Sequence, residues 1–400
     1  MDEKMISTRS KNYSIPNYSL TGDLIAFSKC RLQYRFNNKG ALPPSIPVQQ
    51  WFGEFIHGVM EEAFLIWKKE MKENEKSDFP WSFDKIQGIS IEVAKRLKSK
   101  GLKPYSNMFC NALEKGNKGR CPDENHPHRL VANMRAYYSV NKWGQYLFPL
   151  IQENEVRLQG IRPMPNYDPN VSRANLYGIT GVADVISSFN IKKCPASNKL
   201  VEFLRENEMI SRMIDENQEI QVIIDYKGTD RPEPADPEWE QYEWQILTYM
   251  WLQEENMKST GEVKPIVAGV LLFLDELYPL ADTMKALAKM DPEELRKNYH
   301  ATDVDIAAIR NGESGSLSDD FLLRRSIRII PYDTEQIDHS LKEFDQVVSD
   351  LEKCVLKEMG NSKNVMSCWQ CQTYNQKRCT ACDLKTICTL TEDKNKPKVP

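Results

Sequence analysis

The feature that most constrains this chain is a short apolar strand that ends in opposite charges. Residues 219–230 are Glu-Ile-Gln-Val-Ile-Ile-Asp-Tyr-Lys-Gly-Thr-Asp, and four of the first six are apolar or β-branched. Such a run predicts a buried strand. It finishes in Asp225 and Lys227, which are costly to bury without partners. Because strand side chains alternate, we expect both to project to the same face.

Apolar strands and amphipathic helices alternate on both sides of this segment, which predicts an α/β layer fold. Strands are expected at 153–160, 176–189, 265–277 and 324–333, and helices at 21–36, 48–72, 131–150, 198–216, 238–255, 279–312 and 334–359. A loop rich in Pro and Asn joins the first two strands. Ser19 or Thr21 is expected near the N-cap of the first helix.

The bulk composition is that of an ordinary globular chain, with 40% hydrophobic and 28% charged residues. A net charge of −4 argues against a broad basic surface, but not against a small site that holds phosphate through metal ions. The sequence contains no run of about eighteen apolar residues, the length that would predict a membrane span. The first residues lack the apolar core of a signal peptide. We therefore expect a cytoplasmic protein with no membrane partner. A nucleotide-binding P-loop is also missing, so any helicase or motor would be a separate chain.

A second acid lies inside another predicted strand. Asp184 follows Gly-Val-Ala at 181–183. Carboxylates on adjacent strands make an oxygen-rich site suited to Mg²⁺ or Mn²⁺. Such an ion polarises a phosphoryl oxygen and lowers the pKa of bound water, and a nearby Lys227 could orient that water. The alternative is that Asp225 and Lys227 form a strand-end ion pair and that Asp184 is a turn residue.

Two helices carry polar pairs at the spacing that places side chains on one face. Gln245 and Tyr249 lie on the helix after the Asp225 strand, and His57 and Glu61 lie on the 48–72 helix. A lone histidine on an apolar helix is more often a core residue whose hydrogen bonds are satisfied. Because the sequence also contains the two candidate acids Asp184 and Asp225, we favour a functional interpretation of His57.

In chain order, G-x-x-x-H (53–57), G-V-A-D (181–184), I-I-D-Y-K (223–227) and Q-x-x-x-Y (245–249) resemble the RecB-like branch of the PD-(D/E)XK nuclease superfamily. The resemblance implies a restriction-endonuclease-like α/β core, with a central mixed sheet flanked by helices. It implies metal binding by His57, Asp184, Asp225 and the carbonyl of Tyr226. Lys227 would serve the attacking water, and Gln245 and Tyr249 would steer the DNA strand. The family usually joins its two acids by a short hairpin, so residues 190–218 are an insertion.

Five of the ten cysteines crowd into residues 368–388. In a cytoplasmic chain this indicates metal or cluster ligation rather than disulfides. One interpretation is a zinc ribbon that uses two C-x-x-C pairs, Cys368, Cys371, Cys379 and Cys382. The other is an iron–sulfur cluster on C-x2-C-x5-C, at Cys379, Cys382 and Cys388, with a fourth thiolate from elsewhere.

Cys30, in the segment LIAFSKCRLQYRF, supports the second interpretation. A cysteine in such an N-terminal helix, combined with the distal C-x2-C-x5-C, resembles the iron–sulfur members of the same branch, which include CRISPR-adaptation exonucleases and AddB-type helicase–nuclease subunits. The resemblance implies a [4Fe–4S] cluster on Cys30, Cys379, Cys382 and Cys388. It would be structural, because it closes a loop of ~350 residues. Cys368 and Cys371 are then surplus, which keeps the zinc alternative open.

A smaller group comprises Cys110, Cys121, His126 and His128. We interpret it as an ordinary surface loop, with a small zinc site as the alternative. Cys194 and Cys354 are expected to be ordinary thiols.

Together these patterns predict a metal-dependent DNA nuclease. The resemblance to the iron–sulfur members implies an exonuclease preferring single-stranded DNA or DNA ends, acting in DNA repair, CRISPR adaptation or antiphage defence. A helicase or another defence or repair protein is the expected partner. The nuclease domain is expected at 17–390, with insertions near 75–130, 190–218 and 279–318 and the iron–sulfur segment at 366–390, between flexible ends at 1–16 and 391–400. The alternative is a DNA-end binding or scaffolding subunit with little or no nuclease activity.

Overall fold

The protein is described by a computed structural model over residues 15–38, 48–73, 78–102, 127–195, 197–232, 236–261, 264–360, 365–370, 379 and 382–388. Both expected flexible ends lie outside these residues, except for Ile15 and Pro16. Cys110, Cys121, His126 and Cys371 also lie outside them, as does the side chain of His128. The predictions made for those residues therefore stay predictions.

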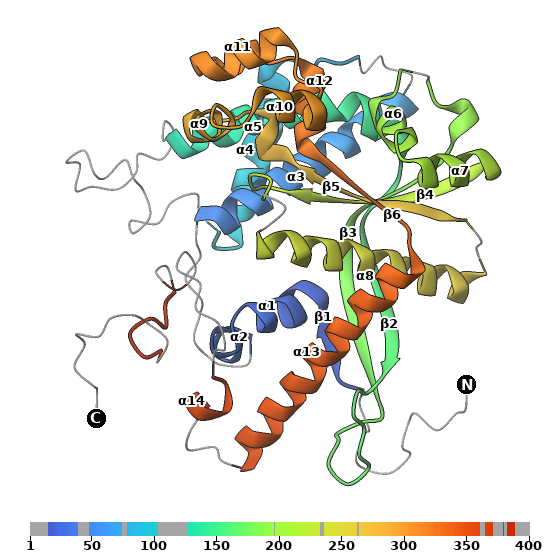
Figure 1. Ribbon diagram of the computed structural model, residues 1–400, viewed down its shortest axis with the longest axis vertical. Coiled ribbons are helices and arrows are strands. Elements are labelled where there is room, and N and C mark those ends of the chain that lie inside the picture. The colour runs from blue at the N-terminus through green and yellow to red at the C-terminus, as the bar shows by residue number, and fades with distance from the viewer. Residues whose placement is uncertain are drawn as a thin grey trace.

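A mixed sheet of six strands forms the centre of the molecule, in the order β1-β3-β4-β5-β6 with β2 pairing to β3 (Figure 1). The strands are β1 Asn17–Ser19, β2 Ile151–Pro163, β3 Leu176–Asn190, β4 Glu219–Lys227, β5 Ile266–Phe273 and β6 Ile327–Pro331. The pairs β1–β3 and β4–β5 are parallel, and the others are antiparallel. The α/β fold with a mixed sheet, predicted from the alternation of strands and helices, is confirmed.

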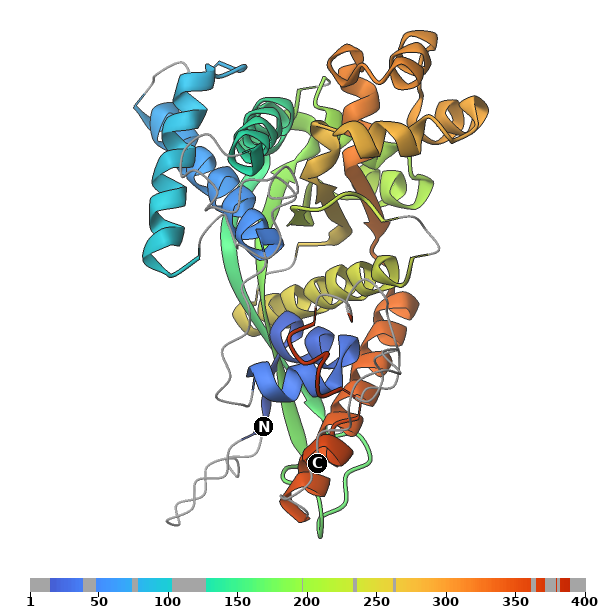
Figure 2. The same cartoon turned by 90° about the vertical axis from the view of Figure 1, so that its left-hand side faces the viewer.

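The longest strand, β3, has a gap in its pairing. Along one edge it pairs with β2 over most of its length, and the two strands form the extended green ribbon of Figure 2. Along the other edge it pairs with β1 through residues 178–180 and with β4 from Val185 onward. Residues 181–183 therefore pair with β2 alone, and Asp184 lies just before the pairing with β4 begins at Val185. The end of β4 faces this gap.

Helices cover both faces of the sheet, and the period-two pattern of β4 decides which side chains meet them. Val222, Ile224 and Tyr226 belong to the hydrophobic cluster that also contains residues of α3 Val48–Lys72, α4 Phe83–Ser99 and α5 Pro127–Leu147. Ile223 belongs to the cluster of α8 Pro237–Thr260 and α13 Thr334–Gly360. Both faces of β4 are thus buried, as its apolar run predicts.

The two ends of the described chain pack against each other. The N-terminal helices α1 Ala26–Lys29 and α2 Arg31–Asn38 lie beside α13. Ion pairs join Arg31 to Asp350 and Arg35 to Glu358. Trp369, which follows α14 Val365–Cys368, is fully buried against the rings of Phe27 and Tyr34. Aromatic packing and ion pairs thus join parts of the chain that are distant in sequence.

The remaining helices extend these layers. They are η2 Leu20–Ile25, η4 Phe148–Leu150, η5 Ile191–Lys193, α6 Lys199–Arg205, α7 Glu208–Glu216, η6 Leu274–Leu277, α9 Ala281–Leu287, α10 Pro292–Tyr299, α11 Asp303–Asn311, η7 Ser314–Ser316 and α12 Asp319–Ser326. Within the described ranges, no helix has both the length and the apolar character needed to cross a membrane.

Three sequence-based expectations about the elements were wrong in detail. The single helix expected over 21–36 begins as the π-helix η2, capped by Ser19 as predicted, and breaks at Cys30, where φ −163° and ψ 107° are extended. The strand expected at 265–277 ends at Phe273 in a 3₁₀ turn, and residues 324–326 belong to α12 rather than to β6. In each place long-range packing, which local periodicity does not contain, overrides the local pattern.

Candidate active site

The predicted acids meet at the gap in the pairing of β3. Alternation along β3 breaks at Asp184, because Ala183 belongs to the α8-side cluster and Val185 to the α3-side cluster, although alternate residues of a regular strand share a face. On β2, Glu155 lies between the partners of Ala183 and Val185, and its φ of 52° is left-handed. The pairing register shifts nearby, between Ile151 and Glu153. Such irregularities redirect side chains, and Asp184 lies at the point where the alternation changes.

Asp184 contacts groups from two other elements. Its Oδ1 lies 3.3 Å from Nδ1 of His57 on α3, and its Oδ2 accepts the backbone N–H of Tyr226 at 2.6 Å. Two glycines let α3 approach the end of β4 this closely, since a Cβ on Gly228 would lie 3.1 Å from the Cα of Gly53. Gly53 is the first residue of the G-x-x-x-H pattern, so that pattern has a packing reason.

The histidine and its aspartate are held as a charged pair. Burial disfavours the imidazolium of His57, but the Asp184 carboxylate outweighs it and raises the pKa of His57 to about 9. Burial also disfavours ionised Asp184, yet His57, the Tyr226 amide and Lys227 together lower the pKa of that carboxyl. His57 is thus in contact with the acid, rather than a core residue with separate partners.

Asp225, the second acid, is 3% exposed and tied to β4 and α8. Its Oδ2 lies 2.5 Å from the Lys227 ammonium. Gln245 on α8 accepts from Lys227 Nζ at 2.7 Å and donates to Asp225 Oδ1 at 3.3 Å. Its amide also lies 3.2 Å from the Tyr249 hydroxyl. Burial raises the pKa of Asp225, Asp184 adds to this rise, and Lys227 opposes it.

Glu155 is a third acid at the site, and the sequence analysis missed it. Loss of hydration, together with the charges of Asp184 and Glu61, raises the pKa of Glu155 to about 6 against the opposing effect of His57. A hairpin register for 153–160 and 176–189 would have placed it opposite Asp184. The long, irregular connection between those strands hides that register from the sequence.

The donor chemistry of the site fits a hard divalent cation such as Mg²⁺ or Mn²⁺. Two carboxylates and one imidazole lie close together there, and Asp225 Oδ2 is buried against the Lys227 ammonium. In the described part of the chain, however, no three His, Cys, Asp or Glu side chains form a ready-made metal-holding group. His57 and Lys227 instead engage the carboxylates that a metal ion would bind.

The four cysteines assigned to a cluster lie in one neighbourhood. Burial raises the pKa of Cys382, and the charges of Cys30, Cys379 and Cys388 add to the rise. Backbone N–H groups of Gln33 and Leu384 donate to the sulfurs of Cys30 and Cys382, each at 3.4 Å. Cys368 is separately buried at the end of α14. The thiols thus come from both ends of the chain, while the bound group itself stays a prediction.

Most of the basic residues near the two sites have structural partners. Besides Arg31 and Arg35, which pair with α13, the Arg231 guanidinium donates to the carbonyls of residues 324, 325 and 327. Trp239 is buried, with its ring stacked on that of Phe273. These groups support the fold rather than offering open phosphate or base contacts.

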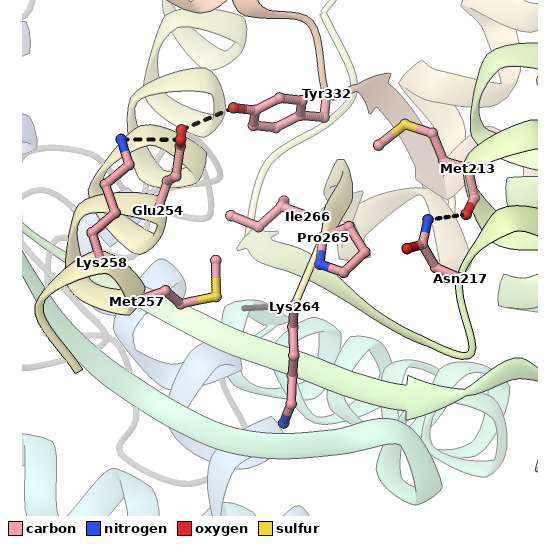
Figure 3. A pocket seen from close by; sticks show the side chains of 9 residues that line it. All are labelled: Met213, Asn217, Glu254, Met257, Lys258, Lys264, Pro265, Ile266 and Tyr332. Carbon is pink, nitrogen blue, oxygen red and sulfur yellow. Dashed lines mark hydrogen bonds and ion pairs between the residues drawn. The ribbon is translucent and has the colours of Figure 1, made fainter. Parts of the chain in front are cut away.

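The pocket drawn in Figure 3 lies away from the acids, at the opposite end of β4 and β5. Ile266, which lines it, pairs with Gln221, whereas Asp225 pairs with Leu271. Glu254 in this pocket is already engaged by Tyr332 at 2.8 Å and Lys258 at 3.1 Å. We therefore assign the chemistry to the gap beside β3.

Comparison with known families matches residues 212–389 to the PD-(D/E)XK nuclease superfamily. This segment carries a domain of that superfamily and includes Asp225, Lys227, Gln245 and Tyr249, whereas His57, Glu155 and Asp184 precede it. The six-stranded mixed sheet with flanking helices is consistent with the restriction-endonuclease-like fold. Superfamily members are nucleases, which supports a phosphodiester hydrolase in general terms. A comparison with curated proteins found no match.

Proposed function

We propose that this protein is a metal-dependent deoxyribonuclease whose active site comprises His57, Asp184, Asp225 and Lys227. The observation that carries the proposal is the contact network at the gap in β3. There the charge of Lys227 lowers the pKa of both Asp184 and Asp225, although a long insertion separates the two acids in the sequence. Burying acids beside cations costs desolvation energy. Perturbed groups of this kind cluster at functional sites.

His57, Asp184, Asp225 and the Tyr226 carbonyl are the groups that would hold Mg²⁺ or Mn²⁺. When bound, such an ion polarises a phosphoryl oxygen and lowers the pKa of water. Lys227, positioned by Gln245 and Asp225, orients the attacking water and stabilises the negative charge that develops on the phosphate. Glu155, with its pKa near 6, is placed to exchange a proton close to neutral pH.

Gln245 and Tyr249 act on the strand that is cut. Gln245 sets the positions of Lys227 and Asp225 through hydrogen bonds to both. The Tyr249 ring lies beneath Gly181, where a Cβ would come within 2.5 Å of it. The residue at 181 therefore has to be small for the ring to pack under the edge of β3.

Substrate form and pathway rest on the resemblance to the RecB-like iron–sulfur nucleases. On that basis we propose a preference for single-stranded DNA or DNA ends, within DNA repair, CRISPR adaptation or antiphage defence and beside a separate helicase or other partner. We also propose a structural [4Fe–4S] cluster on Cys30, Cys379, Cys382 and Cys388, with zinc as the less favoured occupant. The convergence of these thiols supports this.

The decisive test is cleavage of end-labelled single- and double-stranded DNA with Mg²⁺ or Mn²⁺. Wild type should cut, and Asp225→Asn and Lys227→Ala should each lose at least about 100-fold in single-turnover rate. Asp282→Asn is the matched control, because Asp282 is a fully exposed aspartate on α9. A wild type inert on every substrate would favour the scaffolding alternative. Equal rates for Asp225→Asn and wild type would remove this site from the mechanism.

A further inference from the structure

We propose that the outer face of the β2–β3 ribbon binds the sugar–phosphate backbone of the substrate strand, and that Arg157 holds a phosphate neighbouring the one that is cut. The proposal rests on the proposed nuclease function and extends it, because it names the surface that takes the strand beside the active site. Three independent features of the ribbon carry it: its register, a polar groove and an uncompensated cation.

The register places Arg157 next to the acids. Arg157 pairs directly with Val182. Glu155 lies two residues before Arg157 on β2, and Asp184 lies two residues after Val182 on β3. Residues two apart in a strand are separated by about 7 Å. Gly160 marks the opposite face, since a Cβ there would collide with Trp251 of α8 at 2.4 Å. Arg157 and Gln159 therefore point away from α8, toward solvent, and both are exposed.

A groove of about 420 Å³ runs over this face. Its side chains are mainly polar and come from three strands, with Tyr249 at its floor: Asn17 and Ser19 from β1, Arg157 and Gln159 from β2, and Thr180 and Val182 from β3. It adjoins residues 181–184, where β3 lacks a partner on one edge. The groove reaches Gly181 and Val182, two residues before Asp184, so a strand cut at the acids would extend along it.

The charge of Arg157 is not used within the described structure. No ion pair or hydrogen bond there involves its guanidinium, whereas Arg162 on the same strand is bound to Asp345 by two contacts, at 3.0 and 2.6 Å. Around Arg157 lie the acids Glu155 and Asp184, which by themselves would repel a polyanion. Guanidinium groups bind phosphate oxygens bidentately. A phosphodiester backbone suits this surface, because it carries a negative charge at every nucleotide. One phosphate can bind the Arg157 guanidinium while its neighbour lies at the acidic centre.

The test measures binding apart from cleavage. Fluorescence anisotropy with labelled oligothymidylate, in EDTA at several salt concentrations, compares wild type with Arg157→Ala, Arg157→Lys and Val182→Glu, the last placing a carboxylate opposite Arg157. Arg157→Ala should weaken binding about 10-fold and reduce the salt slope by about 0.7, the value for one phosphate contact on a single strand. Val182→Glu should weaken binding at least as much. Arg157→Lys should keep the slope and recover part of the affinity, because it retains charge without the bidentate fork.

Arg212→Ala is the matched control, because Arg212 is an exposed α7 arginine outside the groove and its loss changes net charge equally. Thermal melts confirm that each variant is folded. The inference is overturned if wild type binds no oligonucleotide, or if Arg157→Ala and Arg212→Ala behave alike. A wild type that binds through Arg157 but cuts no DNA with Mn²⁺ would instead overturn the nuclease function while supporting this surface.

Discussion

The Asp184 carboxylate accepts the backbone N–H of Tyr226 at 2.6 Å, across the gap where β3 has lost its strand partner. This one hydrogen bond takes the place of a missing ladder contact, and it ties the first acid to the residue directly after the second. Because Tyr226 lies between Asp225 and Lys227, the bond also fixes the strand end that carries the acid and the base. The distance between the two acids in the sequence therefore has little effect on the site.

Gln245 should be required for full activity although it is not expected to take part in bond cleavage. Gln245→Ala removes the contacts that position Lys227 and Asp225. We expect the single-turnover cleavage rate to fall by about 10- to 100-fold, the usual cost of losing a supporting hydrogen bond around a metal site. Gln253→Ala serves as the comparison, since Gln253 is a buried glutamine of α8 that bonds Gln221 away from the acids. Equal losses in the two variants would show that α8 packing, and not the site, explains the effect.

Metal binding should depend on pH through His57. With a pKa of about 9, His57 is protonated at neutral pH in the metal-free protein, and an imidazole must be neutral to bind a metal ion. Mn²⁺ affinity should therefore rise as the pH rises toward about 9, with release of about one proton per ion. Titration calorimetry in buffers of different ionisation enthalpy measures that proton directly.

His57→Gln should bind Mn²⁺ more weakly and lose most of this pH dependence, while His339→Gln, on α13, should match wild type. If wild-type affinity were flat between pH 6 and about 9, the expected ligand role of His57 would be wrong.

Asp275 should make the fold less stable as the pH rises toward neutrality. Burial raises the pKa of this η6 carboxyl to about 7, against the opposing charge of Arg135. In the unfolded chain its pKa returns to about 3.9. The favourable contribution of the protonated group is fully present below about pH 4 and is lost as the pH rises through about 7, at a cost of at most about 4 kcal/mol.

Urea unfolding of wild type and Asp275→Asn at pH 4 to 8 gives the free energy of unfolding of each protein against pH. The difference between the two profiles measures the contribution of the Asp275 carboxyl. Asp275→Asn should show a smaller loss of unfolding free energy over that range. Asp282→Asn, at a fully exposed position, should follow wild type. A constant difference between wild type and Asp275→Asn at every pH would mean that the carboxyl does not titrate there.

Anaerobically purified protein should be brown and contain iron and acid-labile sulfide. Cys382→Ser should lose most of that iron, because Cys382 lies among the other three thiols, and Cys194→Ser should keep it. Zinc without sulfide would replace the cluster assignment with the ribbon. Since Trp369 and the α13 ion pairs also join the chain ends, we expect Cys382→Ser to remain folded with a lowered melting temperature.

The sequence alone determined the elements whose signal is local. The apolar run of β4 and its charged end, the α3 helix over 48–72 and the pairing of Gln245 with Tyr249 all follow from residues within a few turns of one another. Apolar residues that recur with a period of two or 3.6 indicate directly which side chains are buried, so these local predictions were correct. The same patterns placed Asp225 and Lys227 on one face, where their side chains lie 2.5 Å apart.

Only the tertiary structure decided the contacts that depend on strand register and long-range packing. The irregularity at Glu155 and Asp184, the break in the first helix at Cys30 and the groove around Arg157 arise where segments distant in sequence meet. A shift of one residue in strand pairing would turn Glu155, Asp184 and Arg157 to the other face. Such a shift leaves the composition and periodicity of each β-strand unchanged, so the pattern within one strand does not specify the register.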